Sequence, residues 1–236
     1  YLLSDGTDTV IGTVTLTRSQ RVWYVKNDGA AGGLGRSNDP FDTLLEAQTA
    51  SVAGDWIFVR FGDGTTSGQI GGIALKSGQH LVGEHVGLTL PVSLNGGAAT
   101  TTLFAAVPGN RPLLDDTVAG APEGVAATDA LPAEIAGLNL AGNVNAIDVT
   151  TTAAFAGTGT LVIRDNVVRS ALAEGVDLNL AGTGAVTLAL HDNALTATGT
   201  AVDIVETGTG SLVISRLDDN VVSGNSGGSG IVLGPA

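Results

Sequence analysis

The chain has 236 residues, of which 43% are hydrophobic and 14% are charged, and its formal net charge is −13. This acidic balance argues against nucleic acid and anionic membrane surfaces as partners, because both require a basic patch. No cysteine is present, which excludes disulfides and cysteine-based metal sites. No apolar run reaches the roughly 18 residues of a membrane span, so we expect no membrane insertion. The 35 glycines and the scarcity of charges favour an all-β repetitive protein.

The first segment, residues 1–20, is predicted to be a β-hairpin or strand segment. Residues 4–8 (SDGTD) have turn chemistry, and Val14 and Leu16 then alternate with threonines at the period of a strand. Two strands alone cannot hold a core. We therefore interpret the segment as the remnant of an upstream domain, and the alternative is that its strands pair with the next part of the chain. The segment resembles the last hairpin of an immunoglobulin- or cadherin-like module.

Residues 22–64 carry the most specific pattern, a strand, a glycine-rich loop, a helix and an apolar strand (WIFVRF). Asp39 as N-cap and Pro40 at the first helical position predict a helix over 40–53, which Gly54 ends. Four residues are expected on its apolar face: Leu44, Leu45, Ala47 and Ala50. No βαβ pattern comes after the glycine-rich loop, which argues against phosphate binding.

The middle of the chain, residues 65–134, is less regular. Residues 74–84 (ALKSGQHLVGE) fit one further coil, whereas residues 90–133 are rich in glycine, alanine and proline. We expect irregular coils there, with a long excursion around residues 112–124.

From residue 135 onward a repeat takes over. Aliphatic runs end in Asp-Asn pairs whose asparagines are Asn166, Asn193 and Asn220, and both gaps are 27 residues (193−166 and 220−193). A second short strand and a Gly-Thr-Gly occur in most repeats. One such unit per coil indicates a solenoid.

The cap pattern and the repeats together resemble a right-handed parallel β-helix of the pectate-lyase-like superfamily, as a segment of a large bacterial surface or adhesin-like repeat protein. The resemblance is strongest over residues 20–90 and continues over 135–236. It implies an all-β solenoid with a short N-terminal capping α-helix. We divide residues 21–236 into a cap (22–64), irregular coils (65–134) and regular coils (135–236).

The repeated asparagines are interpreted as a structural ladder. Coils of such a solenoid stack at ~4.8 Å, and a sharp corner needs a residue that tolerates the left-handed region, for which asparagine is the best non-glycine choice. Stacked asparagines also hydrogen-bond along the column. Asn139 lies 27 residues before Asn166, but Leu138 and Leu140 should face inward, which places Leu138 at the ladder position.

A second column is formed by Asp148, Asp177 and Asp203, each flanked by inward-facing aliphatic residues. Their carboxylates should point outward, one above another, and repel. Bound calcium relieves such repulsion, so a cation-binding ladder is one interpretation and a row of solvated acids is the other. The column stops where Val232 takes the place. No other metal or cofactor is expected.

Catalytic machinery is not evident in the sequence. The acid pairs Asp115-Asp116 and Asp218-Asp219 have no histidine or arginine nearby in the hydrolase patterns of this superfamily. His191 is expected at a corner beside Asp192. Two further histidines, His80 and His85, are expected on a loop rim, and three aromatic residues are expected to pack in the cap: Trp23, Tyr24 and Trp56. We assign no catalytic residue and do not expect an enzyme.

The sequence therefore predicts an extracellular or bacterial cell-surface structural protein, either a rod-like adhesin or stalk or a self-assembling filament subunit. Its expected partners are copies of itself or flanking domains of the same polypeptide, and glycans. In a sharper form of the hypothesis, residues 1–18 of one chain add strands to the next. The alternative is a polysaccharide-binding or polysaccharide-degrading β-helix protein, a lyase or a hydrolase.

Overall fold

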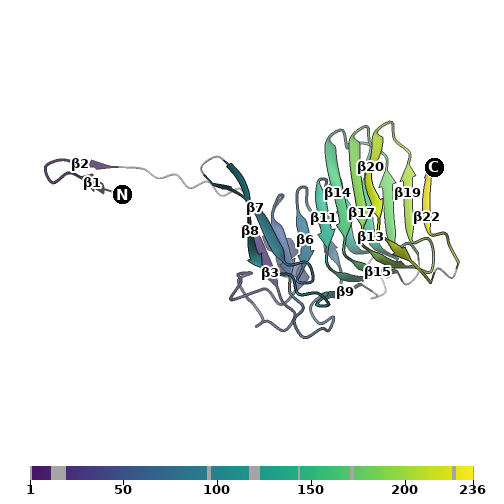
Figure 1. Cartoon of the computed structure of the whole chain (residues 1–236), viewed down its shortest axis with the longest axis horizontal. Coiled ribbons are helices and arrows are strands. Elements are labelled where there is room, and N and C mark those ends of the chain that lie inside the picture. Colours follow the sequence, from purple (N-terminus) through teal and green to yellow (C-terminus); the bar gives the residue numbers. More distant parts are fainter. Residues whose placement is uncertain are drawn as a thin grey trace.

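The structure is a computed structural model that describes residues 2–11, 20–94, 97–116, 123–142, 144–170, 173–224 and 227–235. Residues from 20 onward form a right-handed parallel β-helix of about six turns, and a single short helix lies among the described residues (Figure 1). The predicted fold class is confirmed.

Three parallel sheets, called here sheets I, II and III, run along the solenoid. Sheet I contains β3 (Val22–Val25), β4 (Trp56–Val59), β6 (His80–Gly83), β11 (Ala133–Ala136), β14 (Thr158–Arg164), β17 (Ala185–His191) and β20 (Ser211–Asp218). Sheet II contains β9 (Leu113–Asp116), β12 (Asn139–Gly142), β15 (Val167–Ser170), β18 (Ala194–Thr196) and β21 (Val221–Val222). Sheet III contains β5 (Ile73–Ala74), β10 (Glu123–Thr128), β13 (Asn145–Thr151), β16 (Val176–Leu180), β19 (Val202–Glu206) and β22 (Ile231–Pro235).

The core consists of aliphatic columns that run between the sheets. Strands alternate inward and outward with a period of two, so equivalent inward residues of successive turns stack. In sheet I one such column, fully buried, contains Leu81, Ile135, Ile163 and Leu190. Burying a side chain of this size stabilises the fold by about 1.5–3 kcal/mol. The outward residues of the same strands are free to carry polar groups.

The capping helix α1 (Leu44–Ala50) begins later than predicted. Thr43 is its N-cap and forms a capping box with Glu46, whereas Pro40 and Phe41 are extended because Phe41 pairs with β3 (Phe41 N to Tyr24 O, 2.9 Å). Capping at Thr43 satisfies the first helical N–H groups without Asp39. The predicted apolar face was wrong at one residue, since Leu45 is 67% exposed.

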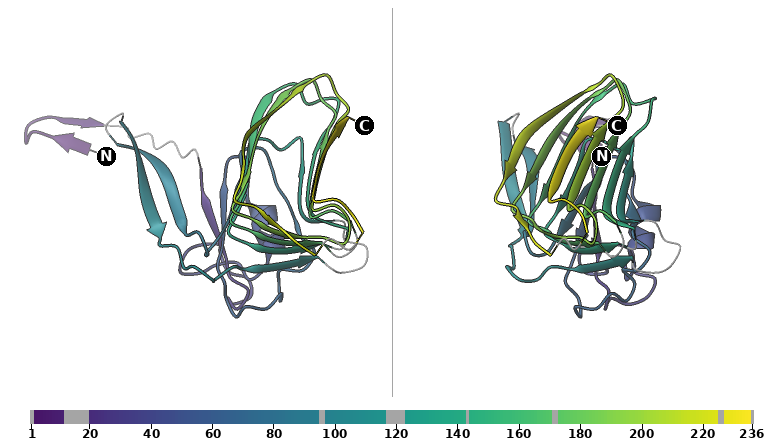
Figure 2. Two further views of the ribbon diagram at one scale, coloured as in Figure 1. Left: turned by 45° about the vertical axis from the view of Figure 1, so that its right-hand side comes forward. Right: turned by 90° about the vertical axis from the view of Figure 1, so that its right-hand side faces the viewer.

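The irregular middle of the chain is more ordered than predicted. The strands β5, β6, β9 and β10 join the three sheets in register. The long excursion is not at residues 112–124, of which 117–122 lie outside the described residues, but is the antiparallel hairpin of β7 (Leu88–Leu94) and β8 (Gly97–Phe104). Figure 2 shows this hairpin standing away from the solenoid.

At the N-terminal end, β1 (Leu2–Ser4) and β2 (Thr9–Ile11) form an antiparallel hairpin. Its turn is stabilised by Asp5, whose carboxylate accepts the backbone N–H groups of Thr7 (2.9 Å) and Asp8 (2.8 Å). These two bonds lower the pKa of Asp5. The predicted strand with Val14 and Leu16 lies outside the described residues. That the hairpin is the remnant of an immunoglobulin- or cadherin-like module stays a prediction.

Candidate functional site

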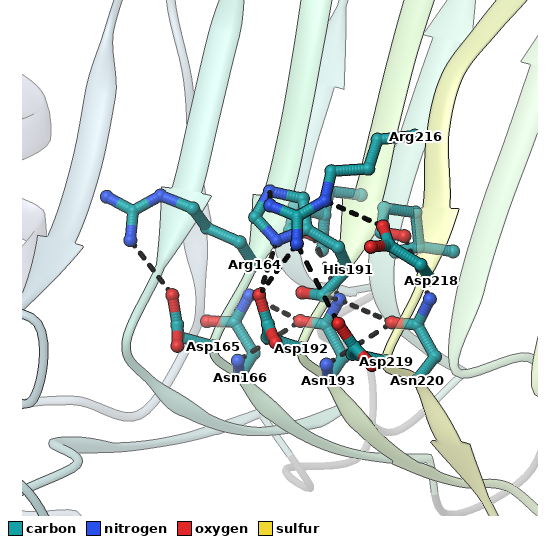
Figure 3. Close-up of polar contacts among 12 residues, drawn as sticks. Arg164, Asp165, Asn166, His191, Asp192, Asn193, Arg216, Asp218, Asp219 and Asn220 are labelled. Atoms are coloured by element: carbon teal, nitrogen blue, oxygen red, sulfur yellow. Dashed lines mark hydrogen bonds and ion pairs between the residues drawn. The ribbon is translucent and has the colours of Figure 1, made fainter.

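The asparagine ladder (Asn166, Asn193 and Asn220) lies at the corner between sheets I and II. The Nδ2 group of Asn166 donates to Asn193 Oδ1 (3.2 Å), and Asn193 Nδ2 donates to Asn220 Oδ1 (2.9 Å), as Figure 3 shows. The backbone N–H of Leu138 donates to Asn166 Oδ1 (3.0 Å). Leu138 therefore occupies the position above the first rung, as the alternation predicts, and Asn139 lies one residue away from it in β12.

The corner itself differs from the prediction in one respect. The left-handed conformation belongs to Asp165 (φ 58°), Asp192 (φ 57°) and Asp219 (φ 54°), not to the asparagines next to them. Aspartate also tolerates this region. Each Asp-Asn pair thus divides two tasks, because the aspartate makes the turn and faces outward, while the asparagine side chain bonds along the column.

The aspartate column (Asp148, Asp177 and Asp203) lies on the outer face of sheet III in the predicted register, with Val232 next to Asp203. Burial and the neighbouring charges of Asp148, Glu174 and Asp203 raise the pKa of Asp177 to about 6. Asn145 Nδ2 and Asn179 Nδ2 each donate to the Asp177 carboxylate at 3.0 Å. The carboxylates are therefore close enough to repel, and amide donors offset part of that repulsion.

A calcium ion on the aspartate column stays a prediction. Within the described ranges, no group of three or more histidine or acidic side chains has an arrangement that holds a metal ion. Asp148 Oδ1 accepts the hydroxyl of Thr150 (2.9 Å), so its partners are also protein groups. Neighbouring hydroxyl and amide groups take the place that a cation would otherwise have.

The richest set of ionisable contacts lies on the outer face of sheet I, and sequence reasoning did not assemble it. His80 stacks on Trp56 with ring centroids 3.8 Å apart, and its Nδ1 is 2.7 Å from Glu134 Oε2. Arg164 donates to Glu134 Oε1 from Nε (3.0 Å) and Nη2 (2.8 Å), and its Nη1 bonds Asp165 (2.9 Å). Burial would raise the pKa of Glu134, but the His80 hydrogen bond and the Arg164 charge hold that pKa below its usual range.

The same face continues at the next turns (Figure 3). His191 Nδ1 is 2.7 Å from Asp192 Oδ2, and His191 Nε2 lies 3.4 Å from Arg216 Nη1. Arg216 Nε also donates to Asp218 (2.6 Å). The hydrogen bond from His191 lowers the pKa of Asp192, and Arg216 adds to that effect. We call the whole set the outer polar row: His80, Glu134, Arg164, Asp165, His191, Asp192, Arg216 and Asp218.

Three expectations are corrected here. The pair Asp218-Asp219 does have an arginine and a histidine close by, because Arg216 contacts both carboxylates and His191. His80 lies in strand β6 and not on a loop rim. His85 lies just after that strand and accepts the N–H of Gly109 (2.8 Å).

A signal for the outer polar row was present in the sequence. Arg164, His191 and Asp218 are spaced by the same 27 residues as the ladder asparagines (191−164 and 218−191), and they stack in sheet I. The spacing of Glu134 and His80 gave no such signal, because the β7–β8 hairpin interrupts the repeat between them.

Comparison with known families adds one result. A family model described as a protein of unknown function (DUF1565) matches residues 26–235. The chain belongs to the DUF1565 family. No curated protein and no solved structure matches it. Among the described residues of this DUF1565 protein, the structure has no helix that is both long and apolar enough to cross a membrane.

The DUF1565 match includes the cap, the ladder, the aspartate column and the outer polar row. Two chemical properties distinguish the row. Its arginines are held by carboxylates, and its histidines each have one ring nitrogen fixed by a carboxylate. A histidine held in this way at Nδ1 keeps Nε2 as the acceptor when it is neutral.

Proposed function

We propose that this DUF1565 protein is a structural, rod-like module of an extracellular or cell-surface protein, and that it is not an enzyme. The observation that supports the proposal is the asparagine ladder, in which the amides of Asn166, Asn193 and Asn220 bond consecutive turns to one another. A solenoid whose turns are joined by buried hydrogen bonds and aliphatic columns resists bending, because each turn contacts mainly its neighbours.

The surface chemistry agrees with a spacer role. The charges of the outer polar row are paired with one another, so few of them are left to bind a substrate. At the last described turn, Leu212 and Leu233 line an apolar pocket of about 440 Å³. Such a surface fits further turns of the same polypeptide or another copy, which we propose as the partners of the module.

Electron microscopy of the purified chain in negative stain, over a range of protein concentrations, tests this role. We expect short stiff rods at low concentration, or filaments if copies join end to end. Particles that bend freely between turns would contradict the proposal. In a parallel assay, acidic and neutral polysaccharides are incubated with the chain, with and without calcium, and loss of polymer length would contradict the non-enzymatic role.

Polysaccharide processing is the second candidate function, and the geometry of His191 favours it. With Asp192 at Nδ1, the neutral ring presents Nε2 as a proton acceptor beside the Arg216 guanidinium. A base next to a cation is suited to proton abstraction from an acidic sugar. If the polysaccharide assay finds cleavage, the variant His191→Ala should abolish it, whereas the variant Thr196→Ala on the same turn should keep it.

A further inference from the structure

A pocket of about 580 Å³ lies at the first turn of the solenoid, and we call it the cap pocket. Strand β3 and the residues just before it form one wall, and the loop 34–37 forms the other. The hydrogen bond from Tyr24 N to Gly35 O (3.1 Å) joins the two walls. The volume is in the range of small-molecule sites, and the pocket lies outside the outer polar row.

The charge of the cap pocket is opposite to that of the protein. Arg21 and Arg36 both line it and no acidic residue does, although the chain has 23 acidic and ten basic residues. Neither guanidinium has an ion pair or hydrogen bond to a described residue. Arg164, in contrast, bonds two carboxylates. The cap pocket therefore holds unused arginine donors, which is unusual in so acidic a chain.

The wall of the pocket is fixed in place. The Trp23 ring stacks on Phe41 with centroids 5.6 Å apart, and its Nε1 donates to Asp55 Oδ2 (2.8 Å). Asp55 is 1% exposed and also accepts the backbone N–H of Arg21 (2.9 Å). The Arg21 guanidinium lies 5.2 Å from the Trp23 ring centroid, a cation–π contact that holds it at the pocket. A prearranged donor loses little entropy when a ligand binds.

We propose that the cap pocket binds a short acidic saccharide through its carboxylate. Arginine forks match carboxylates in a bidentate geometry. Gln20 and Ser37 offer groups for sugar hydroxyls, and Leu34, which is 55% exposed, offers an apolar surface for the ring. The net charge of −13 repels a long polyanion but is largely screened for a small ligand. This site does not depend on the proposed rod function, and either can fail without the other.

Titration of the full chain with D-galacturonate tests the site, with two-dimensional NMR of the tryptophan side chains as the readout. The chain has two tryptophans, Trp23 and Trp56. Trp56 is 8% exposed and belongs to a separate apolar cluster, so its Nε1–H signal is the internal control. We expect a saturable shift of the Trp23 signal, an unchanged Trp56 signal, and no saturation with galactose, which lacks the charge.

Matched variants locate the binding. Arg21→Gln and Arg36→Gln should each weaken galacturonate binding about tenfold or more, because each loses a charged hydrogen bond. Arg169→Gln removes the same charge from an exposed residue in β15 and should change the affinity less than about twofold. Galactose 6-sulfate separates the two anion chemistries, and tighter binding of the sulfate than of galacturonate would overturn the choice of a carboxylate. Absence of saturation by galacturonate, or an equal loss in the Arg169→Gln variant, would overturn the site.

Discussion

The asparagine ladder and the aspartate column cross the same turns of the solenoid, yet neighbours attract in the first and repel in the second. The difference lies in the functional groups. An amide carries both a donor and an acceptor, so each asparagine bonds the next one. An ionised carboxylate only accepts, and stacking brings the charges of Asp148, Asp177 and Asp203 together. A repeat thus amplifies whichever pair interaction its side chains make, favourable or unfavourable.

The largest effect is expected from breaking the middle rung of the ladder. Asn193→Leu fills the space but removes the acceptor of Asn166 and the donor to Ile163 O. Because these groups are buried, we expect a loss of about 3–5 kcal/mol in the free energy of unfolding. Urea denaturation followed by circular dichroism measures it. Thr196→Leu, an exposed change on the same turn, should stay within about 0.5 kcal/mol, and equal losses in both variants would refute the role of the rung.

The next effect concerns the corner that orients the ladder. Asp192→Ala places a residue without a polar side chain in the left-handed conformation, at a cost of about 1–2 kcal/mol. Asp192→Gly removes the same contacts to His191 and Arg216 but relieves the backbone strain. We therefore expect the glycine variant to be about 1 kcal/mol more stable than the alanine variant in the same urea assay. If both variants lose equally, the carboxylate contacts and not the backbone matter at this corner.

A smaller effect of opposite sign is expected in the aspartate column. Asp177→Asn removes the repulsion from Asp148, Glu174 and Asp203 and keeps an oxygen for Asn145 or Asn179. After a discount for solvent screening, we expect a gain of about 1 kcal/mol at pH 7. Asp203→Asn at the edge of the column is the comparison, with a smaller gain because one neighbour is Val232. A loss of stability in Asp177→Asn would mean that the column is not repulsive.

The smallest expected change is the pH dependence of the same pair of proteins. The pKa of Asp177 is about 6 in the folded state, above its ordinary value of 3.8. The folded protein therefore binds this proton more readily, and the stabilisation is complete below pH 4 and is lost as the pH rises through 6. Thermal unfolding between pH 4 and pH 8 should show the advantage of Asp177→Asn shrinking towards pH 4. A constant difference across this range would contradict the raised pKa.

Much of the regular half was predictable because two periods coincide there. The alternation of period two sets which side chains face inward, and the 27-residue spacing sets which of them stack. Together they placed Leu138 above Asn166 and put Asp177 beside Asp148 and Asp203 in register. They did not reveal that the aspartate of each Asp-Asn pair makes the turn, because both residues tolerate the left-handed region.

The first half was harder because its contacts do not repeat. Asp39-Pro40 and Thr43-Glu46 are both good helix starts, and the pairing of Phe41 with β3 decided between them. His80 meets Glu134 across 54 residues that include the β7–β8 hairpin. The cap pocket likewise depends on how the loop 34–37 returns to β3, which local patterns do not encode.

The hydrogen bonds of the ladder all point in one direction along the axis. Asn166 donates from both its backbone N–H and its side chain to Asn193, and Asn193 donates in the same way to Asn220. A turn is therefore completed by the next turn in the chain. During synthesis from the ribosome, each emerging coil supplies the acceptor that the previous coil lacks, so the solenoid closes turn by turn in the order in which it is translated.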